Sequence, residues 1–196
     1  MHHPQRYMIG IDEAGRGPLA GPVAVGVCAV PADLDFSVFA GVKDSKQLSA
    51  LQRQAWLAHM RQEKQMQHAT SLVSAKHIDT FGITHAIQKA MKHALARLKL
   101  DPDACTVLLD GSLYAPKCYG QQKTIIKGDE SEPVIALASI AAKVRRDTYM
   151  IRLAKKYPDY GFEIHKGYGT RLHRERIVQH GICAAHRVSF LTKIWA

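Results

Sequence analysis

The residues best suited to chemistry lie near the start of the chain, in the stretch GIDEAGRGPLAGPV (residues 10–23). Two acids, Asp12 and Glu13, are followed at once by a glycine–arginine–glycine turn, residues 15–17. Carboxylates repel phosphate, whereas a glycine-rich backbone with an arginine attracts it. The two coexist most simply when a divalent cation lies between the acids and a phosphate. The stretch therefore predicts a metal-assisted site for a substrate that carries phosphate.

Two further acids follow short apolar runs that are typical of strands. Asp110 comes after residues 106–109, and Asp129 follows residues 123–126 and a Lys-Gly pair. Four carboxylates at three strand ends can converge at one sheet edge, where two Mg²⁺ ions roughly 3.5–4 Å apart would activate a water for phosphodiester cleavage. Acids after strands are also common as turn residues and helix N-caps. The acids alone leave both interpretations open.

The glycine spacing of the first stretch also resembles a dinucleotide-binding fingerprint, with Gly15, Gly17 and Gly21 in series. That motif should open a helix directly after its strand. Here Pro18 and Pro22 intervene, and a second β-like run follows. A dinucleotide-binding fold is therefore rejected.

The elements that must position these residues follow from hydrophobic periodicity and capping signals. Strands are predicted at residues 7–11, 23–30, 67–73, 106–109 and 123–126. Helices are predicted at residues 49–63, 83–98, 133–156 and 170–179. This order indicates a mixed α/β fold with an antiparallel hairpin at its start and crossover helices later. We expect one domain over residues 1–196, with residues from about 157 to 196 as a helical appendage; a domain break near Tyr157 is the weaker alternative.

Composition limits the function further. The 196 residues include 27 Lys and Arg against 17 Asp and Glu, a formal charge of +10. Such a balance favours a polyanionic partner, with nucleic acid first and a merely soluble basic surface as the alternative. The four cysteines form no CxxC pair, so neither a zinc site nor a disulfide framework is indicated. No secretory signal and no run of ~20 apolar residues is present, so we expect a cytoplasmic, monomeric protein with no membrane segment.

With these residues placed, the chain resembles bacterial ribonuclease HII, the type 2 ribonuclease H family, from about residue 7 to 190. The motifs that carry the resemblance are GIDEAGRGPLAGPV, DSKQL (44–48), LLDG (108–111), KGDE (127–130), ASIAAKVRRD (138–147), HKGYGT (165–170) and HRVSF (186–190). Together these motifs are highly specific, although a lone GxG would not be. The segment 113–122 matches no motif of the family.

The resemblance implies a ribonuclease H-like fold, a mixed five-stranded sheet flanked by helices with a helical C-terminal part. It also implies an endonuclease that hydrolyses the RNA strand of RNA–DNA hybrids, cuts 5′ of single ribonucleotides embedded in duplex DNA, and leaves 5′-phosphates. Mg²⁺ or Mn²⁺ would be the cofactor, in a two-metal mechanism. The implied catalytic and metal-binding residues are Asp12, Glu13, Asp110 and Asp129; the implied substrate-sensing residues are Gly15, Arg16, Gly17 and Tyr168.

Chemistry suggests how the substrate residues would act. Backbone amides of residues 15–17 could approach a ribose closely and bond its 2′-hydroxyl, the group that separates RNA from DNA. Tyr168 would offer its hydroxyl to the same group and its ring to the next sugar. Candidate phosphate contacts are Lys43, Lys46, Lys143, Arg146 and Lys166. Asp147 is expected to be structural, in a local ion pair beside Arg145 and Arg146. His165 and His173 are expected on the surface or positioning backbone, not as zinc ligands.

Three competing functions are weighed. Ribonuclease HIII usually carries an added N-terminal substrate-binding domain, for which a first strand near residue 7 leaves no room, and HKGYGT also favours type HII. A catalytically silent nucleic-acid-binding module would be favoured if any of the four acids were missing, and none is. A structural protein would use the acids as turn residues. Absence of hydrolysis with either metal would revive the last two.

Overall fold

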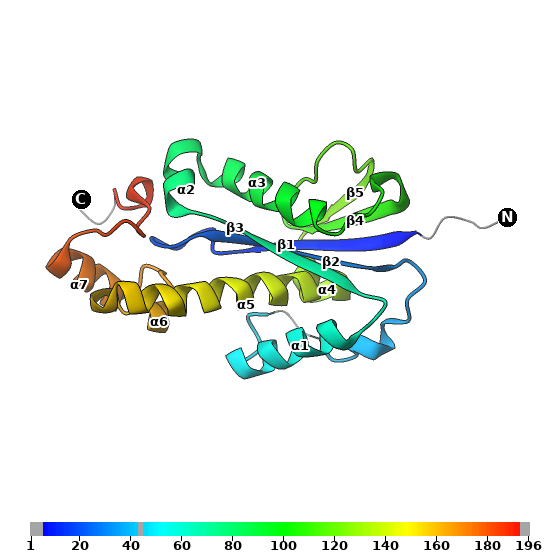
Figure 1. Ribbon diagram of the computed structural model, residues 1–196, viewed down its shortest axis with the longest axis horizontal. Coiled ribbons are helices and arrows are strands. Elements are labelled where there is room, and N and C mark those ends of the chain that lie inside the picture. Colours follow the sequence, from blue (N-terminus) through cyan, green and yellow to red (C-terminus); the bar gives the residue numbers. More distant parts are fainter. Residues whose placement is uncertain (1–5, 43–44, 193–196) are drawn as a thin grey trace.

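A five-stranded mixed sheet forms the centre of the protein (Figure 1), seen in a computed structural model that describes residues 6–42 and 45–192. Its strands are β1 (Tyr7–Ala14), β2 (Val23–Pro31), β3 (Gln67–Val73), β4 (Cys105–Asp110) and β5 (Gln121–Ile125). The strand order is β3-β2-β1-β4-β5. β2 runs antiparallel to both β1 and β3, whereas β4 runs parallel to β1 and to β5. The predicted fold class and the initial hairpin are confirmed.

Helices cover both faces of the sheet (Figure 1), with α2 and α3 on one side and α1 and α5 on the other. The helices are α1 (Ala50–Gln62), α2 (Ala75–Phe81), α3 (Ile83–Ala96), α4 (Gly128–Ser131), α5 (Pro133–Lys156), α6 (Phe162–His165) and α7 (Arg171–His180). Short 3₁₀ turns occupy Phe36–Phe39, Pro102–Ala104, Pro158–Tyr160 and Val188–Phe190. In the described part of the chain, no helix is long and apolar enough to cross a bilayer.

Helix α5 lies unusually close to the two central strands because small residues line the contact. A Cβ built on Gly10 of β1 would lie 2.2 Å from the carbonyl oxygen of Val134 in α5. The first half of α5 is almost fully buried and rich in alanine. This close approach places Ser139 of α5 beside Asp12, with which it forms a side-chain hydrogen bond.

The opposite face of the sheet buries the larger apolar side chains. Ile9 and Ile11 of β1 and Leu109 of β4 pack in one core with Ile87 and Met91 of α3. Because side chains alternate along a strand, the even-numbered neighbours on β1 and β4 point to the α5 face. That alternation decides where the acids of both strands project.

Several boundaries differ from those predicted. β1 continues to Ala14, so Asp12 and Glu13 lie within the strand and pair with Gly26 and Val25 of β2. Pairing of β1 with β4, in contrast, ends at Ile11. Helices α2, α4 and α6 were not predicted from the sequence. Each spans seven residues or fewer, too short for a helical repeat to be recognised.

The C-terminal helices pack against the second half of α5 and against the turn that follows β1. Met150 of α5, Phe162 and Ala185 form a small apolar cluster with Ala20. An isolated antiparallel bridge also joins Ala20 to His186. The helical C-terminal part is confirmed, and the single domain over residues 1–196 stays a prediction.

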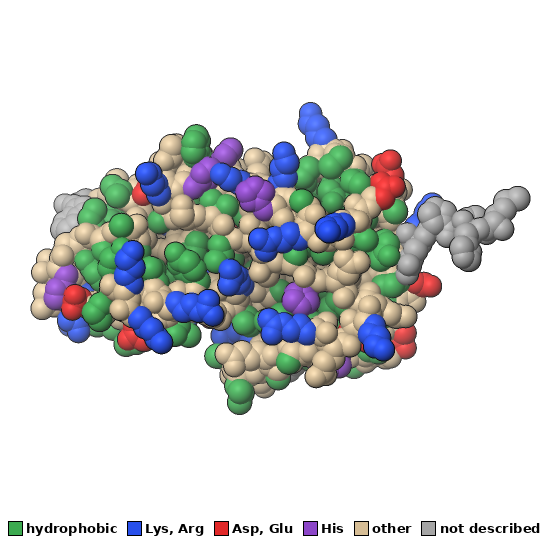
Figure 2. Space-filling view, in the orientation of Figure 1, with side chains coloured by type: hydrophobic (Ala, Val, Ile, Leu, Met, Phe, Trp, Pro, Cys, Tyr) green, Lys and Arg blue, Asp and Glu red, His purple; other side chains and the backbone are tan. Residues whose placement is uncertain are grey.

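Basic side chains dominate the face on which β3 forms the sheet edge. Figure 2 shows Lys and Arg (blue) across the centre of this face, whereas Asp and Glu (red) lie toward its two ends. On this face, basic and acidic side chains are therefore segregated.

Candidate metal and nucleic-acid site

Three of the four predicted acids converge on the α5 side of the sheet. Asp12 and Asp110 each come directly after the paired residues Ile11 and Leu109, so they point to the same face. Asp129 lies in the first turn of α4. One carboxylate oxygen from each of these three residues lies within 4.8 Å of the others. We call this group the carboxylate cluster; its all-oxygen ligand set suits Mg²⁺ or Mn²⁺.

Electrostatics supports a cation at the carboxylate cluster. The pKa of Asp12 is raised from its ordinary 3.8 to about 7, chiefly by burial, and the charges of Glu13 and Asp110 raise it further. Hydrogen bonds from Ser139 and from the Glu13 amide, the latter 2.7 Å, act in the opposite direction. Without a cation, the site therefore holds a carboxyl group that is only partly ionised at neutral pH. A divalent ion would favour the charged form.

The other two acids of the cluster have fixed partners. The Gly128 amide donates to Oδ1 of Asp110 at 2.8 Å, which ties the end of β4 to the start of α4. Nζ of Lys46 donates to Oδ2 of Asp129 at 2.8 Å. The predicted substrate residue Lys46 therefore lies at the cluster itself. Lys43, another predicted phosphate contact, lies outside the described residues.

Glu13 is not part of the carboxylate cluster. As the neighbour of Asp12 within β1, it points to the opposite side of the strand. Its Oε1 accepts from Nε of Arg16 at 2.7 Å. The structure thus brings three of the four predicted acids together and places the fourth, Glu13, beside the turn at residues 15–17.

The turn at residues 15–17 is held by the buried Arg187 and packs against the buried Arg146. Arg187 donates to the carbonyl oxygens of Gly15 at 2.7 Å and of Arg16 and Gly21 at 2.9 Å each. Gly15 has a φ of +90°, and a Cβ there would lie 1.9 Å from Nε of Arg146. Only glycine fits that position. Gly17, in contrast, is exposed and has open space around it.

Arg146 does not contact phosphate, and that prediction was wrong. Its side chain is fully buried. It donates to the carbonyl oxygens of Pro22 and Lys166 at 2.9 Å and of Ala20 at 3.2 Å. It therefore joins the turn after β1 to the loop that carries Tyr168, and a further bond from the Leu19 amide to the Gly167 carbonyl, 2.8 Å, joins the same two segments.

Arg187 was missed as a positioning residue, although it lies in the motif HRVSF. The pKa of Arg187 is lowered to about 9, chiefly by burial and in part by the nearby positive charge of Arg146. Neither arginine is held by an ion pair with a described carboxylate. Both arginines instead donate to backbone carbonyl oxygens, all of them in residues 15–22 except that of Lys166.

Tyr168 stands next to this turn with its side chain partly exposed. Its residue is 42% exposed, and its ring centroid lies 5.6 Å from Cζ of Arg146 and 5.8 Å from Nζ of Lys143. Lys143 also donates to Oδ1 of Asp147 at 2.9 Å. Lys166 is turned toward the backbone carbonyl of Glu163. Of the predicted lysines that are described, Lys46 and Lys143 lie beside predicted site residues.

Asp147 is structural, as predicted, but with other partners. Besides Lys143, it contacts Nη2 of Arg53 at 3.7 Å, not Arg145 or Arg146. Arg53 in turn donates to the carbonyls of Ser45 and Leu48. The aspartate therefore helps to hold the segment that carries Lys46.

Three histidines of the C-terminal part are buried and contact backbone or one another, namely His165, His173 and His186. Nε2 of His165 lies 2.8 Å from the Tyr160 carbonyl, and Nδ1 of His173 lies 3.0 Å from the Tyr168 carbonyl. His173 Nε2 also lies 3.1 Å from Nε2 of His186. Of the two predicted alternatives, a surface location or a role in positioning backbone, the contacts of His165 and His173 agree with the second.

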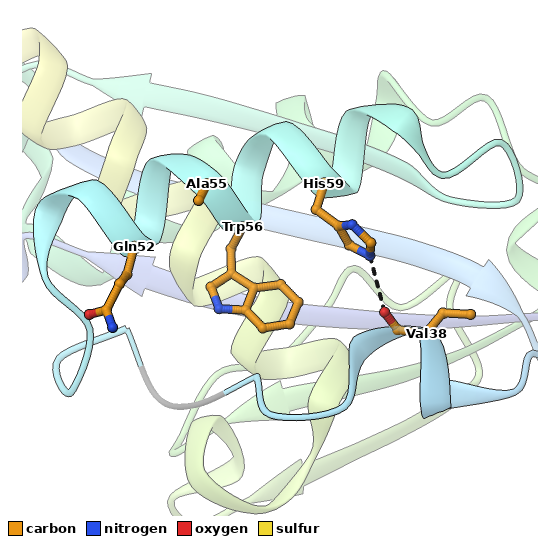
Figure 3. A pocket seen from close by; sticks show the side chains of 5 residues that line it. All are labelled: Val38, Gln52, Ala55, Trp56 and His59. Atoms are coloured by element: carbon orange, nitrogen blue, oxygen red, sulfur yellow. Dashed lines mark hydrogen bonds between the residues drawn. The ribbon is translucent and has the colours of Figure 1, made fainter.

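A shallow apolar pocket of about 290 Å³ lies on the outer side of α1 (Figure 3). It is lined by Val38, Gln52, Ala55, Trp56 and His59. Its only drawn hydrogen bond joins the His59 ring to the Val38 carbonyl at 3.0 Å. With no carboxylate in its lining, this pocket offers none of the chemistry of the cluster.

The fold and the carboxylate cluster together define a ribonuclease H-like protein. RNase HII in a PCNA complex from Archaeoglobus fulgidus has the same fold, with a TM-score of 0.77, 27% identity and coverage of 96% of this chain and 97% of that one. Ribonuclease H2 from Pyrococcus horikoshii gives a TM-score of 0.74 at 26% identity, covering 96% of each chain. An RNase HIII crystallised with Mn²⁺ shares the fold at 18% identity and a TM-score of 0.74, covering 97% of this chain and 69% of that one.

Sequence relatives narrow the class. The family described as Ribonuclease HII matches residues 9–193. Ribonuclease HII of Prochlorococcus marinus is 45% identical over 188 residues, covering 94% of this chain and 96% of its own. That of Caldicellulosiruptor bescii is 44% identical over 189 residues, covering 96% and 88%. The chain belongs to the ribonuclease HII family, as its motifs predicted.

Proposed function

We propose that this member of the ribonuclease HII family hydrolyses the RNA strand of RNA–DNA hybrids and also cuts 5′ of single ribonucleotides embedded in duplex DNA. Ribonuclease H activity follows from the family. One observation supports the proposed cut at single ribonucleotides. The turn at residues 15–17, with its exposed Gly17, lies beside both the acids of β1 and the loop of Tyr168. Hydrolysis would leave a 3′-hydroxyl and a 5′-phosphate.

Mg²⁺ or Mn²⁺ would be held by Asp12, Asp110 and Asp129. When bound, such ions lower the pKa of a water and neutralise charge on a phosphodiester. The residues of the chain supply the rest: Gly128 fixes the orientation of Asp110, and Lys46 fixes that of Asp129. Glu13 remains the proposed fourth acid. Its carboxylate would have to leave Arg16 to approach a second ion.

The 2′-hydroxyl of the ribonucleotide would be read by the backbone at Gly15, Arg16 and Gly17 together with Tyr168. Support comes from the two buried arginines, which hold the turn and the tyrosine loop in one arrangement before any substrate binds. Preorganised donors need little reordering on binding. Lys46 and Lys143, on the same side of the protein as these groups, would contact the phosphate backbone. We also infer that the protein acts as a monomer in the cytoplasm, where such substrates occur.

The experiment is cleavage of labelled duplex DNA that carries one ribonucleotide, with an all-DNA duplex as control. We expect a cut 5′ of the ribonucleotide in Mg²⁺ or Mn²⁺ and none with chelator. Cleavage of continuous hybrids alone would reject the reading assigned to the Gly15 turn and Tyr168. Absence of hydrolysis with either metal would favour a silent nucleic-acid-binding module.

A further inference from the structure

A second charged site lies on the edge of the molecule formed by β3, away from the carboxylate cluster. A pocket of about 220 Å³ opens between α1, α5 and β3. Its charged and polar lining consists of Arg61, His68, Thr70, Arg145, Thr148 and Arg152. We call it the arginine pocket. It lies on the face where Figure 2 shows basic side chains over the junction of these three elements.

The sequence periodicity explains why the groups meet. Arg145, Thr148 and Arg152 are three, four and seven positions apart on α5, so they share one stripe of the helix. Arg61 comes from the last turn of α1. His68 and Thr70 are alternate residues of β3 and face the same side of the sheet. Three elements thus each direct basic or hydroxyl groups into one space.

The charge in this space is not balanced by the protein. No aspartate or glutamate lines the arginine pocket. In residues 6–42 and 45–192, none of its three arginines forms an ion pair with a carboxylate. The pKa of His68 is lowered by burial and by the positive charge of Arg61. An anion in the pocket would remove this mutual repulsion.

The chemistry of the lining selects among anions. Planar guanidinium groups present paired donors that match the oxygens of a phosphate. Thr70 and Thr148 can add hydroxyl donors. Below them, Leu57, Ala141 and Val144 give the pocket an apolar floor. A phosphate attached to an organic body fits this combination better than a bare inorganic ion.

We propose that the arginine pocket is a binding site for a phosphate group carried by a nucleotide or by a nucleic-acid backbone. The site is separate from the proposed cleavage site. Along α5, the charged groups Arg145 and Arg152 follow Ser139, which bonds Asp12, by about 9 Å and about 20 Å at 1.5 Å per residue. The carboxylate cluster also belongs to β1 and β4, whereas the pocket lies at β3, beyond β2. Binding here therefore neither requires nor tests cleavage.

The test is calorimetric titration of the whole protein in chelator, so that no ligand binds through a metal ion. The probes are inorganic phosphate, adenosine 5′-monophosphate and a short all-DNA duplex. The test variant is Arg145→Gln/Arg152→Gln. The matched control is Lys89→Gln/Lys92→Gln, which removes the same charge from exposed positions of α3 on the other face of the sheet.

We expect at least ~10-fold weaker binding of the preferred probe in the arginine variant and unchanged binding in the lysine variant. The preferred probe identifies the source, a nucleotide if the monophosphate binds most tightly and a nucleic-acid backbone if the duplex does. In the wild-type protein, the pKa of His68, followed by NMR, should rise when that probe binds. Equal weakening in both variants would mean that only bulk charge acts, and would overturn the proposal.

A second result would also overturn it, namely that none of the three probes moves the His68 resonance. Cleavage by the two variants is measured in parallel. If the wild-type protein cleaves and binding does not depend on the arginines, only this inference fails. If the protein does not cleave but binding depends on the arginines, only the proposed function fails.

Discussion

At the scale of single residues, the protonation of Asp12 would depend on whether a metal ion occupies the carboxylate cluster. Its pKa of about 7 lies far above the ordinary 3.8 because the carboxyl is buried beside two other acids. Folded protein without metal therefore holds a proton on Asp12 through the mildly acidic range. A cation and a proton compete for the same place, which links metal affinity to pH.

This competition predicts how stability without metal depends on pH. A carboxyl whose pKa is raised by folding contributes stability that is fully present near pH 4 and is lost as pH rises through about 7. As pH rises from about 4 to about 7, the metal-free Asp12→Asn variant should become more stable than the wild type, by roughly 2–4 kcal/mol at the upper limit. Chemical denaturation in chelator measures it. Parallel pH profiles for the two proteins would contradict the assignment.

Replacement of Asp110 by asparagine tests the ligand role with little change of shape. The amide oxygen can still accept from the Gly128 amide, so the fold should persist. We expect turnover in Mg²⁺ to fall at least ~100-fold, because a charged ligand is lost. Single-turnover cleavage and thermal unfolding are compared with Asp103→Asn, a change in the exposed first turn of a 3₁₀ helix. Turnover close to that of the control would contradict the assignment of Asp110 as a metal ligand.

The contributions of the ring and of the hydroxyl of Tyr168 can be tested separately. Tyr168→Ala should reduce the preference for a ribonucleotide next to deoxynucleotides, by about 10-fold or more if ring and hydroxyl both contact substrate. Tyr168→Phe should keep the part that depends on the ring. Competition between junction and continuous-hybrid substrates measures the preference. An unchanged ratio in the alanine variant would reject the role.

At the scale of elements, the conformation of the turn at residues 15–17 is stabilised by segments that are distant in sequence. β1 leads into the turn, α5 supplies Arg146, and the stretch after α7 supplies Arg187. Each guanidinium bonds three backbone carbonyls through three different nitrogens, whereas a lysine would present all its donors on one nitrogen. The turn is thus shaped by its surroundings as much as by its glycines.

Arg187→Gln should weaken both the fold and substrate binding. Loss of donors leaves buried carbonyl oxygens unpaired, which costs about 2–4 kcal/mol and lowers Tm by roughly 5–15 °C in a chain of this size. The control is Arg171→Gln, which breaks only an exposed ion pair with Glu175 and should change stability by less than ~1 kcal/mol. Calorimetry and KM measurements report the two effects. Equal Tm values for both variants would show that the turn does not need Arg187.

Sequence reasoning found the elements with clear periodicity and missed those that depend on distant partners. β2, a β-branched run, and α5, an alanine-rich helix after a proline, were placed nearly to the residue. The sequence did not predict the orientation of Glu13, because the first strand was predicted to end at residue 11. In the longer strand β1, neighbouring side chains point to opposite sides, which separates Glu13 from Asp12. Arg146 was predicted to contact phosphate, because nothing near it in the sequence shows that the carbonyls of Ala20 and Pro22 will accept its hydrogen bonds.

At the scale of the whole molecule, the charge of +10 predicts a steep dependence of substrate binding on salt. Each phosphate neutralised by Lys or Arg releases counterions from the duplex, so affinity falls as a power of salt concentration. If three or four basic groups act together, KM should rise by roughly 30- to 150-fold between ~50 and ~200 mM salt. KM of the wild-type protein at several salt concentrations checks this. A KM that does not change with salt concentration would show that the basic residues do not contribute to substrate binding.

The bond between Arg187 and Gly15 joins residues 172 positions apart. During synthesis, β1 and its acids leave the ribosome long before the arginine that shapes the neighbouring turn. A nascent or truncated chain that stops short of residue 187 thus carries Asp12, Asp110 and Asp129 but not the support of the turn. The order in which the chain is made therefore withholds this support of the turn until residue 187 has been synthesised, so the acids are made before the contacts that shape the turn beside them.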